Sequence, residues 1–148
     1  MTQVNRSALM PYDAQFMFEI VNDVAAYPEF LPWCGSVEIH QQNDHLMEAS
    51  IQMQMTGLKQ WFRTRNNIIP GQSIEMTLLD GPFKSLDGQW QFVAIAEDGC
   101  KIELLLNFEV KQGLAARILK PAFSRIANTM VDSFCERARI IHERQTSD

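Results

Sequence analysis

The side chains in this sequence that are best suited to chemistry are its histidines. His40 and His45 flank a short polar stretch, and His142 lies near the C-terminus. None of the three has a nucleophile or a carboxylate at the spacing that catalytic pairs or metal sites use. The sequence also lacks a glycine-rich phosphate loop, an HExxH motif and a CxxC motif. We therefore predict a binding protein, with no catalytic residues and no metal site.

The cysteines also predict no metal site, and they suggest a reducing compartment. Cys34, Cys100 and Cys135 are widely spaced and odd in number. Such a set fits small core residues in a reducing environment better than disulfide bonds or zinc ligands. The segment Met1–Arg6 lacks the apolar region of a secretion signal, and no apolar run approaches the ~18 residues of a membrane span. We expect a cytoplasmic protein, peripheral to the inner membrane at most.

The net charge of −5 conceals an uneven distribution. Residues 114–144 hold six basic and three acidic side chains, a balance of +3, which leaves −8 for the rest of the chain. An acidic body argues against general nucleic-acid binding, and no DNA partner is expected. The basic segment leaves two alternatives open: a local contact with an anion, or a solvated helix face. Its basic residues are Arg117, Lys120, Arg125, Arg137, Arg139 and Arg144, and Arg63 and Arg65 form a smaller outward pair on a predicted strand.

The basic residues belong to a long amphipathic helix that is predicted from Pro121 to His142. Pro121 suits a first helical turn, where its missing N–H breaks no bond, so residues 114–120 are expected to form a separate turn that meets the helix at a kink. A helix with one apolar side needs an apolar partner. The apolar residues recur at steps of three and four and share one side: Phe123, Ile126, Ala127, Met130, Phe134, Ala138 and Ile141.

The stretch Glu38–Val110 predicts that partner, because its hydrophobic period is two. The segment 48–55 is the clearest strand, with every second residue apolar. Hairpin-length turns join the later strands and predict antiparallel neighbours. An opening strand over residues 3–10 and a helix capped by Asp13 precede them. The predicted fold class is α+β, a curved antiparallel sheet of about six to seven strands packed on the C-terminal helix, in a single domain over residues 1–148.

A sheet that curves away from a helix leaves room for an apolar cavity. Thr64 and Asn66 share the inward side of their strand with Phe62, which predicts either a partly wet cavity or polar groups that pair with each other. Methionines suit a wall that accepts flexible apolar shapes. The candidate cavity residues are Met53, Met55, Phe62, Thr64, Asn66, Trp90, Phe92, Leu106, Phe108, Phe123, Ile126 and Met130.

Two loops supply a candidate rim for this cavity. The segment 24–34 contains two prolines within five residues, which exclude a long helix or a central strand. Its Phe30, Leu31 and Trp33 are too apolar for a free loop, so they either close the core or rim a ligand opening. Phe83 follows a Gly-Pro turn and is the fourth rim candidate.

Arg137 lies at the edge of the apolar helix stripe and allows two interpretations. In the first, its stem follows the apolar surface and its guanidinium pairs with an acidic residue. In the second, it is partly buried and anchors a ligand carbonyl, such as that of a quinone.

Four segments resemble motifs of one family. Residues 21–34 contain VNDV and YPEFLPWC, residues 80–92 contain DGPFKSL and WQF, residues 108–110 read FEV, and residues 134–138 read FCERA. Together and in this order they resemble the START-like polyketide cyclase/dehydrase family, in the branch of the coenzyme-Q-binding proteins and the bacterial ribosome association toxins. The resemblance covers about residues 5–142. Two departures are Val110, where the family has an aromatic residue, and the Ile–His pair at 141–142, where the family ends in a Val–Tyr-like pair.

The resemblance implies a helix-grip fold with a hydrophobic tunnel between sheet and helix. It implies that the tunnel binds ubiquinone or a related isoprenoid lipid in support of respiratory electron transport, without any other cofactor. The alternative is a toxin that binds the large ribosomal subunit and blocks subunit association, and a polyketide cyclase-like enzyme is a remote third. The acidic body favours the lipid interpretation. The expected partners are thus an apolar small molecule, with the large ribosomal subunit and a transient membrane contact as further candidates.

Overall fold

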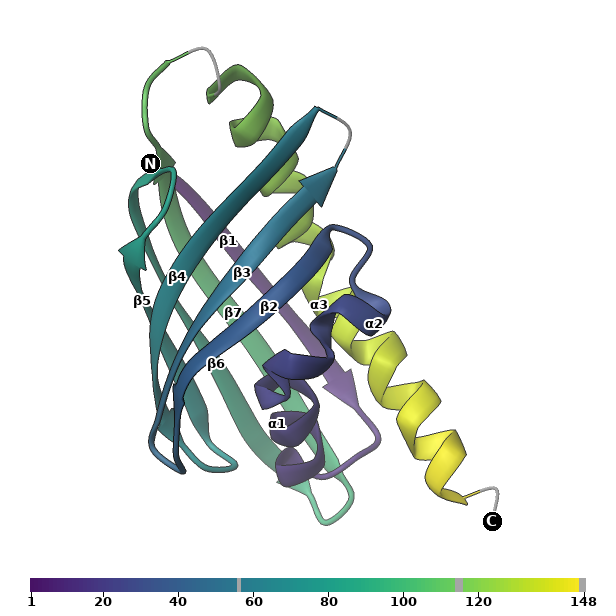
Figure 1. Ribbon diagram of the computed structural model, residues 1–148. Helices are drawn as coiled ribbons and strands as arrows, with labels where there is room; N and C mark the ends of the chain where they lie inside the picture. The colour runs from purple at the N-terminus through teal and green to yellow at the C-terminus, as the bar shows by residue number, and fades with distance from the viewer. Residues whose placement is uncertain (56, 114–115, 147–148) are drawn as a thin grey trace.

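The computed structural model describes residues 1–55, 57–113 and 116–146. Seven strands and three α-helices follow one another along the chain, with one short 3₁₀ helix, η1, before α2 (Figure 1). Their order is β1 (Thr2–Met10), α1 (Ala14–Asn22), η1 (Val24–Ala26), α2 (Tyr27–Phe30), β2 (Cys34–Gln42), β3 (Leu46–Met55), β4 (Leu58–Ile69), β5 (Ser73–Asp80), β6 (Phe83–Ala96), β7 (Gly99–Val110) and α3 (Ala116–Thr146).

The strands form one antiparallel sheet in the order β1-β7-β6-β5-β4-β3-β2. From β2 to β7 each strand pairs with the next along the chain, which confirms the predicted hairpin connections. The first strand, β1, forms the edge opposite β2 and pairs with the last strand, β7. Thr2 lies opposite Phe108 and Met10 opposite Cys100. Figure 1 shows the sheet curving around α3. The predicted α+β fold class is confirmed.

Helix α3 begins earlier than the sequence predicted. It runs unbroken from Ala116 to Thr146, so Pro121 lies within the helix and not at its first turn. The proline lacks the N–H that would bond to the carbonyl of Arg117, but the backbone on both sides continues the helix. The predicted separate turn is therefore wrong from Ala116 onwards, and its first two residues lie outside the described residues. The buried side of α3 consists of Leu119, Phe123, Ile126, Ala127, Val131, Phe134 and Ala138, while Met130 and Ile141 are partly exposed.

The first helix is held at both ends by side chains. The carboxylate of Asp13 accepts a hydrogen bond from the backbone N–H of Phe16 at 2.7 Å, which confirms the predicted N-cap. At the other end, the buried hydroxyl of Tyr27 donates to the carbonyl of Val21, a group that the end of a helix leaves without an intrahelical partner. Burial raises the pKa of Tyr27 far above its usual value, and Cys34 and Asp23 add to the shift.

Aromatic rings pack between α3 and the sheet. The ring of Phe123 lies 4.7 Å from that of Phe83 and 4.8 Å from that of Phe108, measured between centroids. Further along the helix, Phe134 packs edge-on against Trp90 at 5.3 Å. Edge-to-face pairs of this kind add to the free energy of burying the rings. Within the described residues, no helix is long and apolar enough to cross a membrane.

Candidate functional site

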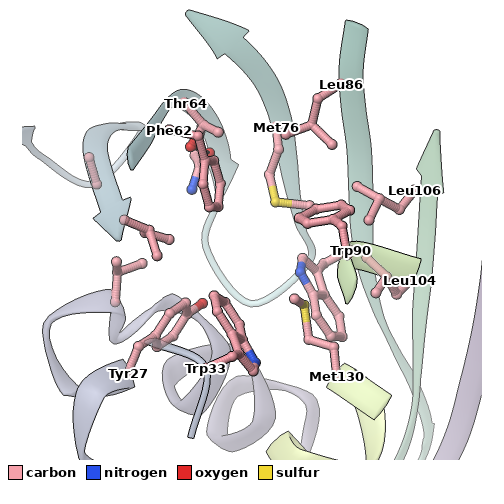
Figure 2. A pocket seen from close by; sticks show the side chains of 15 residues that line it. Tyr27, Trp33, Phe62, Thr64, Met76, Leu86, Trp90, Leu104, Leu106 and Met130 are labelled. Carbon is pink, nitrogen blue, oxygen red and sulfur yellow. Dashed lines mark hydrogen bonds between the residues drawn. The ribbon is translucent and has the colours of Figure 1, made fainter. Parts of the chain in front are cut away.

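A small apolar cavity lies between α3, the connector of η1 and α2, and the sheet (Figure 2). Its volume is about 70 Å³. That is about two water molecules' share of the liquid, since one water takes about 30 Å³. The lining side chains are Val24, Tyr27, Trp33, Ala49, Ile51, Phe62, Thr64, Asn66, Met76, Leu86, Trp90, Leu104, Leu106, Phe123 and Met130.

The polar groups of the cavity wall largely satisfy one another. Thr64 and Asn66 both point inward from β4, and the Thr64 hydroxyl donates to the side-chain oxygen of Asn66 at 3.0 Å. The Tyr27 hydroxyl is occupied by the carbonyl of Val21. Of the two alternatives for Thr64 and Asn66, the structure therefore shows the pairing. The wall offers a ligand mainly apolar contacts.

One glycine shapes the sheet side of this cavity. A Cβ on Gly88 would lie 2.7 Å from Cδ1 of Leu106 and 2.9 Å from Cε of Met76, closer than carbon atoms pack. The missing side chain therefore lets Met76 and Leu106 cross the inner face of β6 (Figure 2). Below them in the view, Trp90 lies toward Met130, and Tyr27 and Trp33 lie at the opposite wall.

A larger groove opens to solvent beside the cavity. Its volume is about 690 Å³, within the ~300–1,000 Å³ of typical ligand sites. Trp33 belongs to the walls of both spaces and is itself buried. The Trp33 side chain therefore lies in the wall that the two spaces share. The groove is lined by Pro32, Trp33, Gln54, Met55, Ile118, Pro121, Ala122, Arg125, Ile126 and Thr129.

The predicted cavity residues divide into three groups. Two of them, Met55 and Ile126, line the groove and not the inner cavity. Met53, Phe92 and Phe108 line neither space and are at most 4% exposed, so they belong to the packed core. That any of these residues contacts a ligand stays a prediction. The remaining candidates all line the inner cavity: Phe62, Thr64, Asn66, Trp90, Leu106, Phe123 and Met130.

The structure corrects the predicted rim. Leu31 and Phe83 are only 1% and 2% exposed and lie in the core. Phe83 does not sit at a loop tip, because the turn before it is short and β6 begins at Phe83 itself, with the ring directed onto Phe123. Phe30 is partly buried and lines a separate hollow with Arg137. Of the four, only Trp33 borders the groove and the cavity.

Arg137 follows the first of its two interpretations. Its guanidinium lies 3.7 Å from the carboxylate of Glu29 and 4.8 Å above the ring centre of Phe30. It lines neither the cavity nor the groove. Arg137 thus joins α3 to α2 through an ion pair and a cation–π contact.

Seven cavity residues were not among the candidates. Ala49 and Ile51 alternate with Met53 on β3, so the period of two contained the signal for them. Val24 and Tyr27 come from the connector, where no period applies. Their positions depend on how η1 and α2 fold back onto the sheet. The other three are Met76, Leu86 and Leu104.

The histidines and cysteines form no reactive group within the described residues. His40 shares a 2.7 Å hydrogen bond with Ser50, and His142 packs on Tyr12 with ring centres 4.7 Å apart. All three cysteines are free, and burial raises the pKa of each thiol, that of Cys34 to about 11. Each is therefore protonated at neutral pH. The described part of the chain has no group of three or more His, Cys, Asp or Glu placed to hold a metal ion.

Ion pairs neutralise many of the basic side chains. Glu48 accepts hydrogen bonds from both Arg63 and Arg65 at 2.9 Å, so the outward arginine pair is not a free positive patch. On α3, Arg139 is held between Glu136 and Glu143. Among the described residues, the exposed cations without a side-chain hydrogen bond or ion pair are Lys59, Lys84, Lys111, Arg117, Lys120 and Arg125.

These six cations lie at one end of the molecule, which we call the basic end. The backbone N–H of Lys111 bonds to Pro82 beside Lys84, and Lys120 shares a hollow with the end of β7. Lys59 pairs across β3–β4 with Gln54, which lines the groove together with Arg125. Figure 1 shows the β3–β4 hairpin, the N-terminus and the start of α3 at this end.

A curved antiparallel sheet that grips a long C-terminal helix around an apolar cavity defines a helix-grip domain. A family model described as polyketide cyclase / dehydrase and lipid transport matches residues 10–135. The chain therefore belongs to this family. A START superfamily protein from Mycobacterium smegmatis has the same fold, with a TM-score of 0.78 at 17% identity over 94% of this chain and 98% of that one.

Two relatives represent the two branches that the sequence resembles. The chain is 48% identical to the ribosome association toxin RatA of Pseudomonas aeruginosa, over 95% of this chain and 98% of the toxin. It is 23% identical to the mitochondrial coenzyme Q-binding protein COQ10 homolog B of Xenopus laevis, over 97% of this chain and 60% of that protein. The similarity is thus much stronger on the toxin side.

Proposed function

We propose that this protein binds the ribosome as a RatA-type ribosome association factor. Its basic end would contact ribosomal RNA on the large subunit and hinder the joining of the subunits. The observation that carries the proposal is the group of six exposed, unpaired cations at one end of the molecule. The 48% identity to a ribosome association toxin supports it. This reverses the preference for a lipid ligand that the sequence suggested.

The acidic composition does not oppose this proposal, because part of the negative charge lies away from the basic end. Asp44 and Asp98 lie in the β2–β3 and β6–β7 hairpins, at the end of the sheet away from the basic end (Figure 1). Asp80, beside the turn that bonds to Lys111, and Glu109, in the hollow with Lys120, lie at the basic end, where the six unpaired cations outnumber them. A phosphate backbone that meets only the basic end is attracted, since each neutralised phosphate releases counterions.

Charge removal at the basic end tests the proposal. The triple variant Arg117→Gln, Lys120→Gln, Arg125→Gln should weaken co-sedimentation with large ribosomal subunits by about 100-fold at physiological salt if each cation makes one phosphate contact. The matched control Arg65→Gln, Lys101→Gln, Arg139→Gln removes the same three charges from side chains already paired with carboxylates. Equal losses in both variants, or no sedimentation of the unaltered protein, would contradict the proposal.

A second candidate function is the binding of an apolar small molecule. The observation that favours it is the 690 Å³ groove, separated by Trp33 from a cavity with an apolar wall. The cavity of about 70 Å³ is too small for a quinone ring, so Trp33 and Met130 would have to move. A short-chain ubiquinone analogue should then change the tryptophan fluorescence in a saturable way, and Trp33→Phe should remove most of that change. If no quinone or lipid is extracted from the purified protein and the fluorescence does not respond, this candidate fails.

A further inference from the structure

The groove lies inside the basic end. Arg125 is one of the six unpaired cations and also part of the groove wall. Lys120 directly precedes Pro121 of the groove, and Lys59 pairs with Gln54 on its other side. The surface expected to meet RNA and the mouth of the apolar groove therefore share a side chain.

The groove walls indicate the chemistry of an occupant. Met55, Ala122, Ile126 and the Trp33 ring offer apolar contacts to a hydrocarbon chain. The free guanidinium of Arg125 suits a phosphate or carboxylate, which it can bind through two parallel hydrogen bonds. Within the described residues, no carboxylate lines the groove to oppose an anion. A single apolar chain with an anionic head matches both features.

We propose that this groove binds a single-chain anionic amphiphile and that the occupied groove excludes ribosomal RNA from the basic end. The exclusion rests on the function proposed above. The anionic head occupies Arg125, so this cation no longer reaches a phosphate of the RNA. The head also adds negative charge among the other five cations, and like charges close together repel. The amphiphile thereby releases the protein from the ribosome.

Dodecyl phosphate, held below its critical micelle concentration, is the probe. Isothermal titration calorimetry should show binding of one molecule to the protein. Inorganic phosphate, which has the charge but no chain, should not bind measurably at the same concentration. Dodecanol, which has the chain but no charge, separates the two contributions. It should bind more weakly than dodecyl phosphate by about threefold, the size of one exposed ion pair.

The competition is then measured by co-sedimentation with large ribosomal subunits. Dodecyl phosphate at ten times its dissociation constant should raise the apparent dissociation constant for the subunit by about tenfold. Ala122→Phe and Thr129→Phe each place a ring in the groove from α3. With either variant, the ratio of subunit affinities with and without dodecyl phosphate should fall to about one. Two variants are used because Ala122 is partly buried whereas Thr129 is exposed.

The outcomes separate this inference from the proposed function. If the protein sediments equally well with and without bound dodecyl phosphate, the exclusion is wrong and the ribosome proposal stands. If dodecyl phosphate does not bind, the groove is not an amphiphile site. The same holds if it displaces both groove variants from the large subunit as well as it displaces the unaltered protein. If the protein does not sediment under any condition, the proposed function fails and the exclusion fails with it.

Discussion

Among single residues, Tyr27 connects the first helix, the cavity and α3. Its hydroxyl donates to the carbonyl of Val21 near the end of α1, its ring lines the cavity, and it packs edge-on against Phe134 of α3 at 5.3 Å. The backbone carbonyl of Val21 depends on this hydroxyl. Sequence periodicity predicts no such contact, because Tyr27 lies in a connector with two prolines.

Tyr27→Phe should destabilise the protein by about 1–3 kcal/mol, the cost of leaving a buried hydrogen-bonding group without its partner. The ring packing should persist, so the fold should be retained. Urea unfolding measures the change. Tyr12→Phe, which removes a hydroxyl that makes no hydrogen bond within the described residues, is the control. Equal stability of Tyr27→Phe and the unaltered protein would show that water replaces the hydroxyl.

On the outer face of the sheet, Glu48 accepts hydrogen bonds from two arginines. The guanidinium groups of Arg65 and Arg63 hold its pKa below the ordinary 4.5. A carboxyl group whose pKa is lower in the folded protein than in the unfolded chain stabilises the fold above the ordinary value. This contribution is lost as the pH falls through the lowered pKa.

Glu48→Gln should therefore be less stable than the unaltered protein at pH 7, where two arginines lose their shared counter-charge. The difference in free energy of unfolding should shrink steadily below about pH 4.5. Urea unfolding at a series of pH values checks this. Glu75→Gln changes an exposed carboxylate on β5 that has no ion pair among the described residues, and it should show no such trend. A Glu48→Gln difference that is the same at pH 3 and pH 7 would refute the assignment.

Among the elements, α3 shows what periodicity predicts and what it does not. The steps of three and four correctly place Phe123, Ile126 and Phe134 on the buried side. They do not reveal the start of the helix, because Pro121 is compatible with either a first turn or a helix interior. Local sequence favours the first turn, and packing of Leu119 in the core decides for the longer helix.

Phe134→Ala tests how strongly α3 is held. Its side chain is fully buried and its ring packs against Tyr27, Phe30 and Trp90. The variant should lose about 3–5 kcal/mol of stability, because removal of a buried ring leaves a cavity. Asp132→Ala, on the exposed side of the same helix, should change the stability by less than about 0.5 kcal/mol. Thermal or urea unfolding of both variants measures the difference in stability, and similar losses would contradict the burial of Phe134 between α3 and the sheet.

The strands were more predictable than the loops around the site. The period of two places Phe62, Thr64 and Asn66 on one side, and all three line the cavity. The predicted rim was wrong at Leu31 and Phe83, which are buried. An apolar residue near a turn can point inward or outward, and only tertiary contacts decide between the two. The groove could not be predicted at all, since it depends on the distance between α3 and the β3–β4 hairpin.

For the whole molecule, we expect ribosome binding to depend on which cations are unpaired more than on the total number of cations. The six cations of the basic end should contribute to ribosome binding roughly additively. Replacing Lys84 and Lys111, neither of which lines the groove, with Gln should therefore reduce the slope of log K against log salt by about 2. Co-sedimentation at several salt concentrations gives the slope. Arg65→Gln with Lys101→Gln is the matched control, and an equal reduction in that variant would show that net charge alone matters.

The separation of charge along the molecule also sets a length scale. Helix α3, with 31 residues, is about 46 Å long. In ~0.01 M salt, electrostatic fields extend about 30 Å, so an approaching polyanion senses most of the molecule and is repelled by its net negative charge. In ~0.1 M salt they extend only about 10 Å, and the polyanion senses the nearest end alone. The encounter rate should therefore pass through a maximum as salt is added, where a uniformly basic protein would show only a decline.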